Sequence, residues 1–358
     1  MSSQAKNISN RILLYGDAIL EATDQEMSVD PNVFVIGLDV ADHKAILGST
    51  RGLVEKFGPE RVITTPLSED AITGVAIGAA MAGMRPIHIH IRMDFLLLCM
   101  NQLINMAAKA HYMYDGQLSV PLVVRVIVGR SWGQGAQHSQ SLHSMFMHVP
   151  GVKVVAPSNA FDAKGCMISA VRDNNPVVFI EQRHLYYTDA LVPKHPYTVE
   201  FGKTRTVGKG EDITIVAISA MVIEAMKARE LVEEVSISAE VLDPISLVPL
   251  DIDTIVASVS RTKRLLVVDN AWTICGAGAE ILASVVESLG IKNSIQVSRM
   301  GFKHTTCPAT PALEKYFYPT PVSIAARAYE MVWPNKPAWA PDAVKAEMAH
   351  QLKFRGPF

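Results

Sequence analysis

The sequence predicts an α/β protein with two domains and mostly parallel sheets. Short apolar segments typical of strands alternate with longer segments of helical periodicity along most of the 358 residues. Such alternation favours parallel strands covered by helices on both faces. A chain of this length is typical of about two domains. The hydrophobic content of 49% and the charged content of 19% fit a well-packed soluble protein.

The first domain is predicted over residues 1–195. Its expected helices cover 8–26, 53–57, 71–84, 96–114 and 159–172, and its expected strands cover 33–37, 62–63, 86–92, 118–128, 152–156 and 177–180. Ser68 is a plausible N-cap for the third helix. In the strand 86–92, alternation places isoleucines on one face and His88 and His90 on the other. The two histidines could bind a metal, but no third ligand has suitable spacing, so we favour plain strand alternation.

The second domain is predicted over residues 206–333, after a proline-containing linker at 191–199. Its expected strands cover 212–217, 239–242 and 264–269, and its expected helices cover 219–234, 252–260 and 276–289. Gly276-Ala-Gly after a strand could indicate dinucleotide binding, but the third glycine of that motif is missing. Residues 334–358 form a tail in which Val344, Met348 and Leu352 are spaced as one face of a short helix. The tail is either a packing arm on a neighbouring subunit or disordered.

Composition and charge indicate which kinds of binding partner and which cellular compartment to expect. A net charge of −2 gives no reason to expect nucleic-acid binding or attraction to anionic membranes. The four cysteines are widely scattered, with no pair at metal-ligand spacing, so we interpret them as reduced thiols. Neither a secretory signal nor a transmembrane segment is visible in the sequence. We therefore expect a cytoplasmic protein with no membrane partner.

The most informative stretch runs from Thr64 to Gly74. Pro66 fixes the backbone at the end of an apolar strand, and a helix of small residues follows. Glu69 is thereby expected at a strand-to-helix junction, among apolar neighbours that remove part of its water. A simpler interpretation is that Glu69 and Asp70 complement the positive N-terminus of the helix.

This stretch and several others carry a resemblance to a known family. The segments are Thr65-Pro-Leu-Ser-Glu69, Arg85-Pro-Ile87, Asp94-Phe95, Gln102-Leu-Ile-Asn105, Gln137-His-Ser-Gln140, Val149–Pro157, Asp162-Ala-Lys164, Arg172–Pro176 and Leu185-Tyr186. In this order they resemble the β subunit of the thiamine diphosphate-dependent E1 component of 2-oxo acid dehydrogenases. The likeness runs from about Val33 to about Ala328. It implies a transketolase-like pyrimidine-binding domain followed by a transketolase-like C-terminal domain, the latter used mainly for assembly.

The resemblance also implies roles for individual residues. In the family, thiamine diphosphate lies between two different domains, and this type of chain holds the aminopyrimidine ring. Glu69 matches the glutamate that hydrogen-bonds a pyrimidine nitrogen, and Phe95 matches the aromatic residue stacked on the ring. Leu67 and Ile91 match apolar positions of the pyrimidine pocket. His138 matches a loop histidine that faces the thiazolium and the substrate and can shuttle a proton.

The expected metals and partners follow from the same resemblance. Leu122, Ala170, Asp173 and Asn175 match a site where family members hold K⁺, largely through backbone carbonyl oxygens. The diphosphate and its Mg²⁺ are normally held by a Gly-Asp-Gly and a later Asn-Asn, and no Gly-Asp-Gly occurs here. An α-type partner chain is therefore expected to hold Mg²⁺, in an α2β2 assembly. A lipoyl acyltransferase is a further expected partner.

The implied reaction is decarboxylation of a 2-oxo acid and transfer of the acyl group to a lipoyl carrier. The alternative is a split transketolase-like carboligase that transfers the carbanion equivalent to an aldehyde acceptor. A non-catalytic stabilising subunit is a third interpretation, and the presence of Glu69, Phe95 and His138 argues against it. The substrate itself cannot be read from this chain, because the pocket is shared with the partner.

Four positions depart from the family pattern. Leu38 and Ile89 stand where the family has glutamates, Asn101 stands where it has an aspartate, and Leu98 occupies a place that is often polar. Acidic residues in this region are thought to link the two active sites of the assembly. Their replacement leads us to expect two independent sites, a different substrate or a specialised paralogue.

Overall fold

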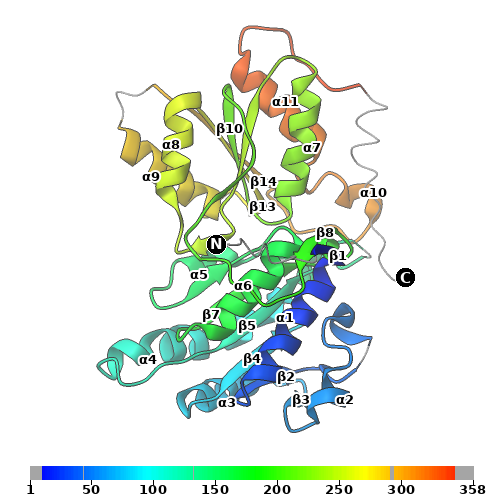
Figure 1. Ribbon diagram of the computed structural model, residues 1–358. Helices are drawn as coiled ribbons and strands as arrows, with labels where there is room; N and C mark the ends of the chain where they lie inside the picture. Colours follow the sequence, from blue (N-terminus) through cyan, green and yellow to red (C-terminus); the bar gives the residue numbers. More distant parts are fainter. Residues whose placement is uncertain (1–9, 43, 132, 291–293, 343–358) are drawn as a thin grey trace, which may run out of the picture.

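The computed structural model of the chain describes residues 10–42, 44–131, 133–290 and 294–342, and it forms two packed α/β units (Figure 1). The first unit contains a seven-stranded sheet with the strand order β12-β6-β7-β5-β4-β2-β3. Its strands are β2 (Val33–Gly37), β3 (Val62–Thr64), β4 (Arg85–His90), β5 (Val123–Val128), β6 (Lys153–Val155), β7 (Val177–Gln182) and β12 (Ser246–Val248). All pairings are parallel except that of β12 with β6.

Helices cover both faces of this sheet, as the sequence predicts. On one face, α1 (Tyr15–Val29) packs against α6 (Ala160–Arg172). On the other face lie α3 (Glu69–Met81) and the segments that follow β4. Shorter helices connect the strands: η1 (Ala45–Gly48), α2 (Leu53–Phe57), η4 (Gly135–Gln137), α5 (His143–Met147) and η5 (Arg183–Leu185). The Asn159 side chain caps the start of α6, because it accepts a hydrogen bond from the backbone N–H of Asp162.

The second unit contains a five-stranded sheet with the order β14-β13-β10-β11-β9. The strands are β9 (Arg205–Gly208), β10 (Ile213–Ala217), β11 (Ala239–Asp243), β13 (Arg264–Trp272) and β14 (Gln296–Phe302), and only β9 pairs antiparallel. Figure 1 shows α7 (Met221–Glu233) and α11 (Pro321–Val332) on one face, with α8 (Ile252–Thr262) and α9 (Ala277–Leu289) on the other. A short helix, α10 (Pro311–Glu314), lies near the first unit. The predicted α/β class is confirmed.

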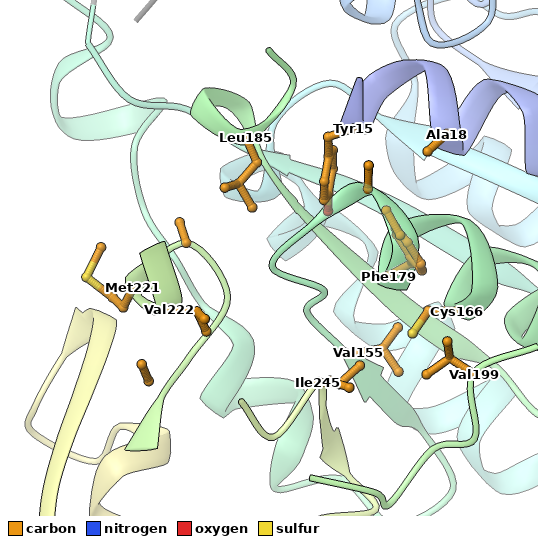
Figure 2. Packing of buried hydrophobic residues seen from close by; sticks show 14 of the residues in the cluster. Tyr15, Ala18, Val155, Cys166, Phe179, Leu185, Val199, Met221, Val222 and Ile245 are labelled. Atoms are coloured by element: carbon orange, nitrogen blue, oxygen red, sulfur yellow. The ribbon is translucent and has the colours of Figure 1, made fainter. Parts of the chain in front are cut away.

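One apolar cluster runs through both units. Figure 2 shows Tyr15, Cys166 and Phe179 of the first unit in the same cluster as Met221 and Ile245 of the second, all of them buried. A polar contact also crosses the boundary, because the Ser158 hydroxyl donates a hydrogen bond to the carboxyl group of Asp243. Within the second unit, the same carboxyl group accepts a hydrogen bond from the backbone N–H of Ile245 at 2.9 Å. The two units are thus packed as one body.

A charged pair lies inside the first unit. The guanidinium of Arg125 on β5 donates from Nε and Nη2 to the two carboxylate oxygens of Glu181 on β7, at 2.6 and 2.9 Å. Both side chains are 0% exposed. The Tyr186 hydroxyl also donates to Glu181, and Arg125 donates to Ser49 at 2.8 Å. Burial of these charges is compensated because nearly every donor and acceptor is paired.

The predicted helix over residues 8–26 is wrong in its first part. Residues Asn10–Leu14 form a strand, β1, which pairs antiparallel with β8 (Asp189–Pro193). Ile12 and Leu14 are exposed while Leu13 packs against the core, so the local period is two rather than 3.6. The start of the predicted linker at 191–199 is likewise part of β8. Residues 8 and 9 lie outside the described residues.

The predicted helix over residues 96–114 is also wrong as a single α-helix. The segment contains η2 (Met93–Cys99), which is 3₁₀, then η3 (Asn101–Ala107), which is a π-helix, and finally α4 (Ala108–Met113). Apolar spacing cannot separate these helix types, because each presents one face at intervals of three to five residues. The predicted strand at 118–128 begins only at Val123, beyond Pro121, which has no N–H to donate.

Three further findings concern expectations from composition. All four cysteines carry free thiols. Within the part of the chain that the structure describes, no helix has the length and apolarity needed to cross a lipid bilayer. The tail packs Trp339 near Tyr329, with ring centroids 5.1 Å apart. Val344, Met348 and Leu352 lie outside the described residues.

Candidate active site

A cavity of about 330 Å³ opens at the carboxyl ends of β2 and β4, beside the start of α3. Five side chains that the resemblance singles out line it together: Leu67, Glu69, Ile91, Phe95 and His138. They come from three separate stretches of the sequence. Crevices at the carboxyl ends of parallel strands are the usual ligand sites of open α/β sheets.

Glu69 is the first residue of α3 and is half-buried at the cavity wall. Glu69 and Asp70 both lie in the first turn of the helix, where a negative charge is favourable. Ser68 occupies the predicted N-cap position, but its side chain makes no capping hydrogen bond. Because one flank of the carboxylate remains open, it can accept a hydrogen bond from a ligand in the cavity.

Phe95 and His138 are in edge-to-face contact in the lining of the cavity. Their ring centroids are 5.3 Å apart and the rings are nearly perpendicular, at 81°. Phe95 lies in η2 and is 36% exposed, while Leu67 on the opposite lip is 71% exposed. An aromatic face and apolar walls of this kind suit a flat heterocycle.

The loop that carries His138 is held from both units. Arg92, just after β4, donates from Nε to the Gln134 side-chain oxygen at 2.8 Å. The backbone N–H of Ser131 donates to Oε1 of Glu314, at the end of α10, at 2.7 Å. The Arg130 guanidinium lies 4.2 Å from the centroid of the Tyr318 ring. Assembly is therefore not the only role of the second unit, because the second unit also fixes the candidate catalytic loop.

His88 and His90 line the floor of the cavity as neutral imidazoles. Burial lowers the pKa of His88 to about 4. A hydrogen bond from Nδ1 to the backbone oxygen of Ile36 raises this pKa, but its effect is smaller than that of burial. Burial also lowers the pKa of His90, and the neighbouring His88 adds to the effect. Among the described residues, no group of three or more His, Cys, Asp or Glu side chains is placed to hold a metal. The simple alternation predicted from the sequence is the better interpretation, although it gave no sign that both rings reach the cavity.

The four residues of the expected K⁺ site gather at the opposite edge of the sheet. Leu122 precedes β5, and Ala170, Asp173 and Asn175 surround the end of α6. Three of the four backbone oxygens already have partners: Val177 N–H donates to Leu122 at 2.9 Å, Asp173 N–H donates to Ala170 at 3.3 Å, and Arg85 Nη1 donates to Asp173 at 3.0 Å. An oxygen with two lone pairs can still accept a second interaction.

The four departures from the family pattern fall into two groups. Leu38 and Ile89 line the cavity itself. Leu98 is 58% exposed and Asn101 is exposed, and Asn105 donates to the Asn101 side-chain oxygen at 2.9 Å. Only the first pair can influence a bound ligand directly.

Two known families match the chain. Residues 13–188 match the transketolase pyrimidine binding domain, and residues 202–324 match the transketolase C-terminal domain. The β subunit of acetoin:2,6-dichlorophenolindophenol oxidoreductase from Cupriavidus necator is 41% identical, over 87% of this chain and 95% of that protein. The namesake from Bacillus subtilis is 40% identical, over 90% of this chain and 98% of that one.

The β subunit of the pyruvate dehydrogenase E1 component from Rickettsia bellii is 39% identical, over 85% of this chain and 94% of that protein. The chain belongs to the E1 β-subunit family. The family was predicted from the sequence and is confirmed. Among solved structures, a split-gene transketolase superposes on this E1 β-type chain with a TM-score of 0.73 at 21% identity, covering 89% of this chain and 98% of that one. That similarity supports the fold alone.

Proposed function

We propose that the chain is the β subunit of a thiamine diphosphate-dependent E1-type enzyme. Its reaction decarboxylates a 2-oxo acid and transfers the acyl group to a lipoyl carrier. The observation that carries the proposal is the meeting of Glu69, Phe95 and His138 in one cavity of about 330 Å³. Relatives at about 40% identity that are named as pyruvate and acetoin oxidoreductase subunits support the same reaction class.

The cavity fits the aminopyrimidine half of the cofactor. Phe95 offers an aromatic face, Leu67 and Ile91 offer apolar contacts, and the half-buried Glu69 offers a carboxyl group at the edge. When bound, thiamine diphosphate supplies an electron sink for the electron pair that departing CO2 leaves behind. Glu69 would share a proton with a nitrogen of the pyrimidine ring and so orient and polarise the ring. His138 exchanges a proton with the substrate.

The remaining components belong to a partner chain. We propose an α-type subunit that contributes the diphosphate site with its Mg²⁺, in an α2β2 assembly, and a lipoyl acyltransferase as the acceptor. The open lip at Leu67, which is 71% exposed, is a surface that such a subunit would cover. The carbonyl oxygens near Leu122, Ala170 and Asp173, with Asn175 beside them, are the proposed K⁺ site. The free thiols support a reducing compartment, and we propose the cytoplasm.

The test compares two neighbouring acids in the complex with an α-type subunit. Glu69→Gln removes the carboxylate in the cavity, while Asp70→Asn is a matched control in the same helical turn and outside the cavity lining. We expect kcat for lipoyl reduction to fall by about 10²- to 10⁴-fold in Glu69→Gln, since proton transfer would lose its polarising group. Asp70→Asn should stay within a few-fold of the unmodified complex. Equal activity of the two variants would refute the assignment of Glu69.

The acceptor is tested separately. The complex is given a 2-oxo acid with either a lipoyl domain or an aldehyde, and dihydrolipoyl groups or condensation products are measured. Consumption of the lipoyl group is the expected result. Carbon–carbon bond formation without lipoyl reduction would indicate the carboligase alternative instead.

A further inference from the structure

Arg92 stands out among the side chains that line the cavity. It lies two residues beyond the end of β4, and its guanidinium is fixed on two sides. Nε donates to the Gln134 side chain at 2.8 Å, and Nη1 donates to the backbone oxygen of Ile91 at 2.6 Å. The third nitrogen, Nη2, makes no hydrogen bond with the described residues. A planar group held in this way presents a preset donor edge.

The charge of Arg92 has little local compensation. Within the described chain, no carboxylate lies within ion-pair distance of its guanidinium, and the carboxylate whose charge raises its pKa is that of Asp94. One Asp94 oxygen already accepts a hydrogen bond from the backbone N–H of Gln140 at 3.1 Å. Burial lowers the pKa of Arg92, yet the group stays charged at neutral pH. A partly buried cation without a paired anion is costly, and a bound anion would offset that cost.

The cavity is otherwise receptive to negative charge. Among the described residues that line the cavity, Glu69 is the only acid, and Leu38 and Ile89 are neutral. A second cation lies close by: burial lowers the pKa of Arg183 to about 10, and the charge of Arg92 contributes to that shift. The charges of the two guanidinium groups therefore interact, and Arg92 is the one that lines the cavity. Phe95 and the isoleucines leave the other side apolar.

The chemistry of decarboxylation limits which anion Arg92 can hold. A guanidinium bound to the reacting carboxylate would stabilise the substrate more than the transition state, since that charge leaves as neutral CO2. Such a contact would slow the reaction. An anionic group that remains on the substrate is held equally before and after the step and costs nothing in rate.

We propose that Arg92 is a specificity-determining residue that binds an anionic group, a carboxylate or a phosphate, which stays on the substrate throughout the reaction. This inference rests on the proposed function, because it concerns the same cavity. The substrate class is then a 2-oxo acid with a second, remote anion, or a phosphorylated acceptor. Neutral and singly charged substrates of equal length bind without using Nη2.

The first experiment measures binding to the cofactor-loaded complex by calorimetry. Glutarate, glycerol 3-phosphate and the neutral 1-pentanol are the non-reacting probes. We expect glutarate or the phosphate ester to bind about 10- to 100-fold more tightly than 1-pentanol, as a hydrogen-bonded charge pair predicts. The stronger of the two identifies the carboxylate or the phosphate as the remote anion. Equal binding of all three probes overturns the proposal.

Three variants separate charge from geometry. Arg92→Met removes the charge at similar size, Arg92→Lys keeps a charge, and Gln134→Leu removes the tether while the guanidinium remains. The preference for the anionic probe should disappear in Arg92→Met, recover in part in Arg92→Lys and persist in Gln134→Leu. If Arg92→Met weakens all probes to the same extent, Arg92 only supports the loop and the proposal is wrong.

Turnover distinguishes this inference from the proposed function. Substrate pairs are 2-oxo acids of equal length with a terminal carboxylate or a terminal methyl group. We expect KM to rise about 10- to 100-fold in Arg92→Met for the dicarboxylic member alone, with kcat little changed. Anion preference in calorimetry without any turnover of 2-oxo acids would refute the proposed function and leave the inference standing. Turnover of 2-oxo acids without any preference for the anionic probes would refute the inference about Arg92 and leave the proposed function standing.

Discussion

Replacement of Asp243 by asparagine should stabilise the chain at alkaline pH. Asp243 is 0% exposed at the boundary of the two units. Burial, with a smaller contribution from the charge of Asp162, raises its pKa from the ordinary value of 3.8 to about 7, although hydrogen bonds from Ser158 and Ile245 and the charge of Arg205 act in the opposite direction. The folded chain therefore holds a proton on Asp243 that the unfolded chain releases.

The sign and size of the effect follow from proton linkage. Between pH 3.8 and about 7 the folded state binds more protons than the unfolded state, so stability falls as the pH rises through this window. The difference of roughly three pKa units corresponds to about 4 kcal/mol above pH 7, at 1.36 kcal/mol for each unit. Asparagine has nearly the same shape, keeps one oxygen acceptor and carries no charge at any pH.

Urea unfolding at pH 4 and pH 8 tests this reasoning. The gain of Asp243→Asn over the unmodified chain should be close to zero at pH 4 and approach about 4 kcal/mol at pH 8. Asp253→Asn on the exposed side of α8 is a matched control and should show no such change between the two pH values. A gain that is the same at both pH values, or a loss at pH 8, would show that Asp243 is ionised in the folded chain without cost.

Two further outcomes are expected. Arg125→Met alone should lower the free energy of unfolding in urea by about 3–5 kcal/mol, because it leaves the Glu181 charge buried without its partner. The double variant with Glu181→Leu should lose less stability than Arg125→Met alone. Additive losses of the two single variants would contradict the pairing. Glu314→Ala should speed hydrogen exchange of the Ser131 amide by about 10- to 150-fold, since a charged acceptor is lost; Glu314→Gln should fall between, and unchanged exchange would exclude the tether.

The order of elements and the candidate site were predictable from the sequence where one local signal dominated. Buried parallel strands such as Val33–Gly37 and Val177–Gln182 carry continuous apolar runs, and these positions agree with the prediction. The grouping of Glu69, Phe95 and His138 followed from motif resemblance rather than from spacing, because these residues are far apart along the chain. Their common cavity exists only once β2, β4 and the loop that carries His138 are aligned.

The features that the sequence did not predict depend on contacts between distant parts of the chain. β1 contains five residues and its pairing partner, β8, lies about 180 positions away, so no local periodicity reveals it. The link between Glu314 and the backbone of Ser131 is equally non-local and depends on a backbone donor that no side-chain pattern marks. Arg92 could have been noticed as a lone cation after an apolar strand, but its approach to Gln134 depends on the tertiary fold.

The strand β12 has a consequence for any attempt to divide the chain. It belongs by sequence to the second half, yet it completes the first sheet against β6 through antiparallel pairing. A fragment that ends near residue 195 would expose the unpaired N–H and C=O groups of β6 as a free sheet edge, a template for aggregation. The first half therefore depends on the second for the completion of its sheet, and the first half produced alone would need that edge to be capped.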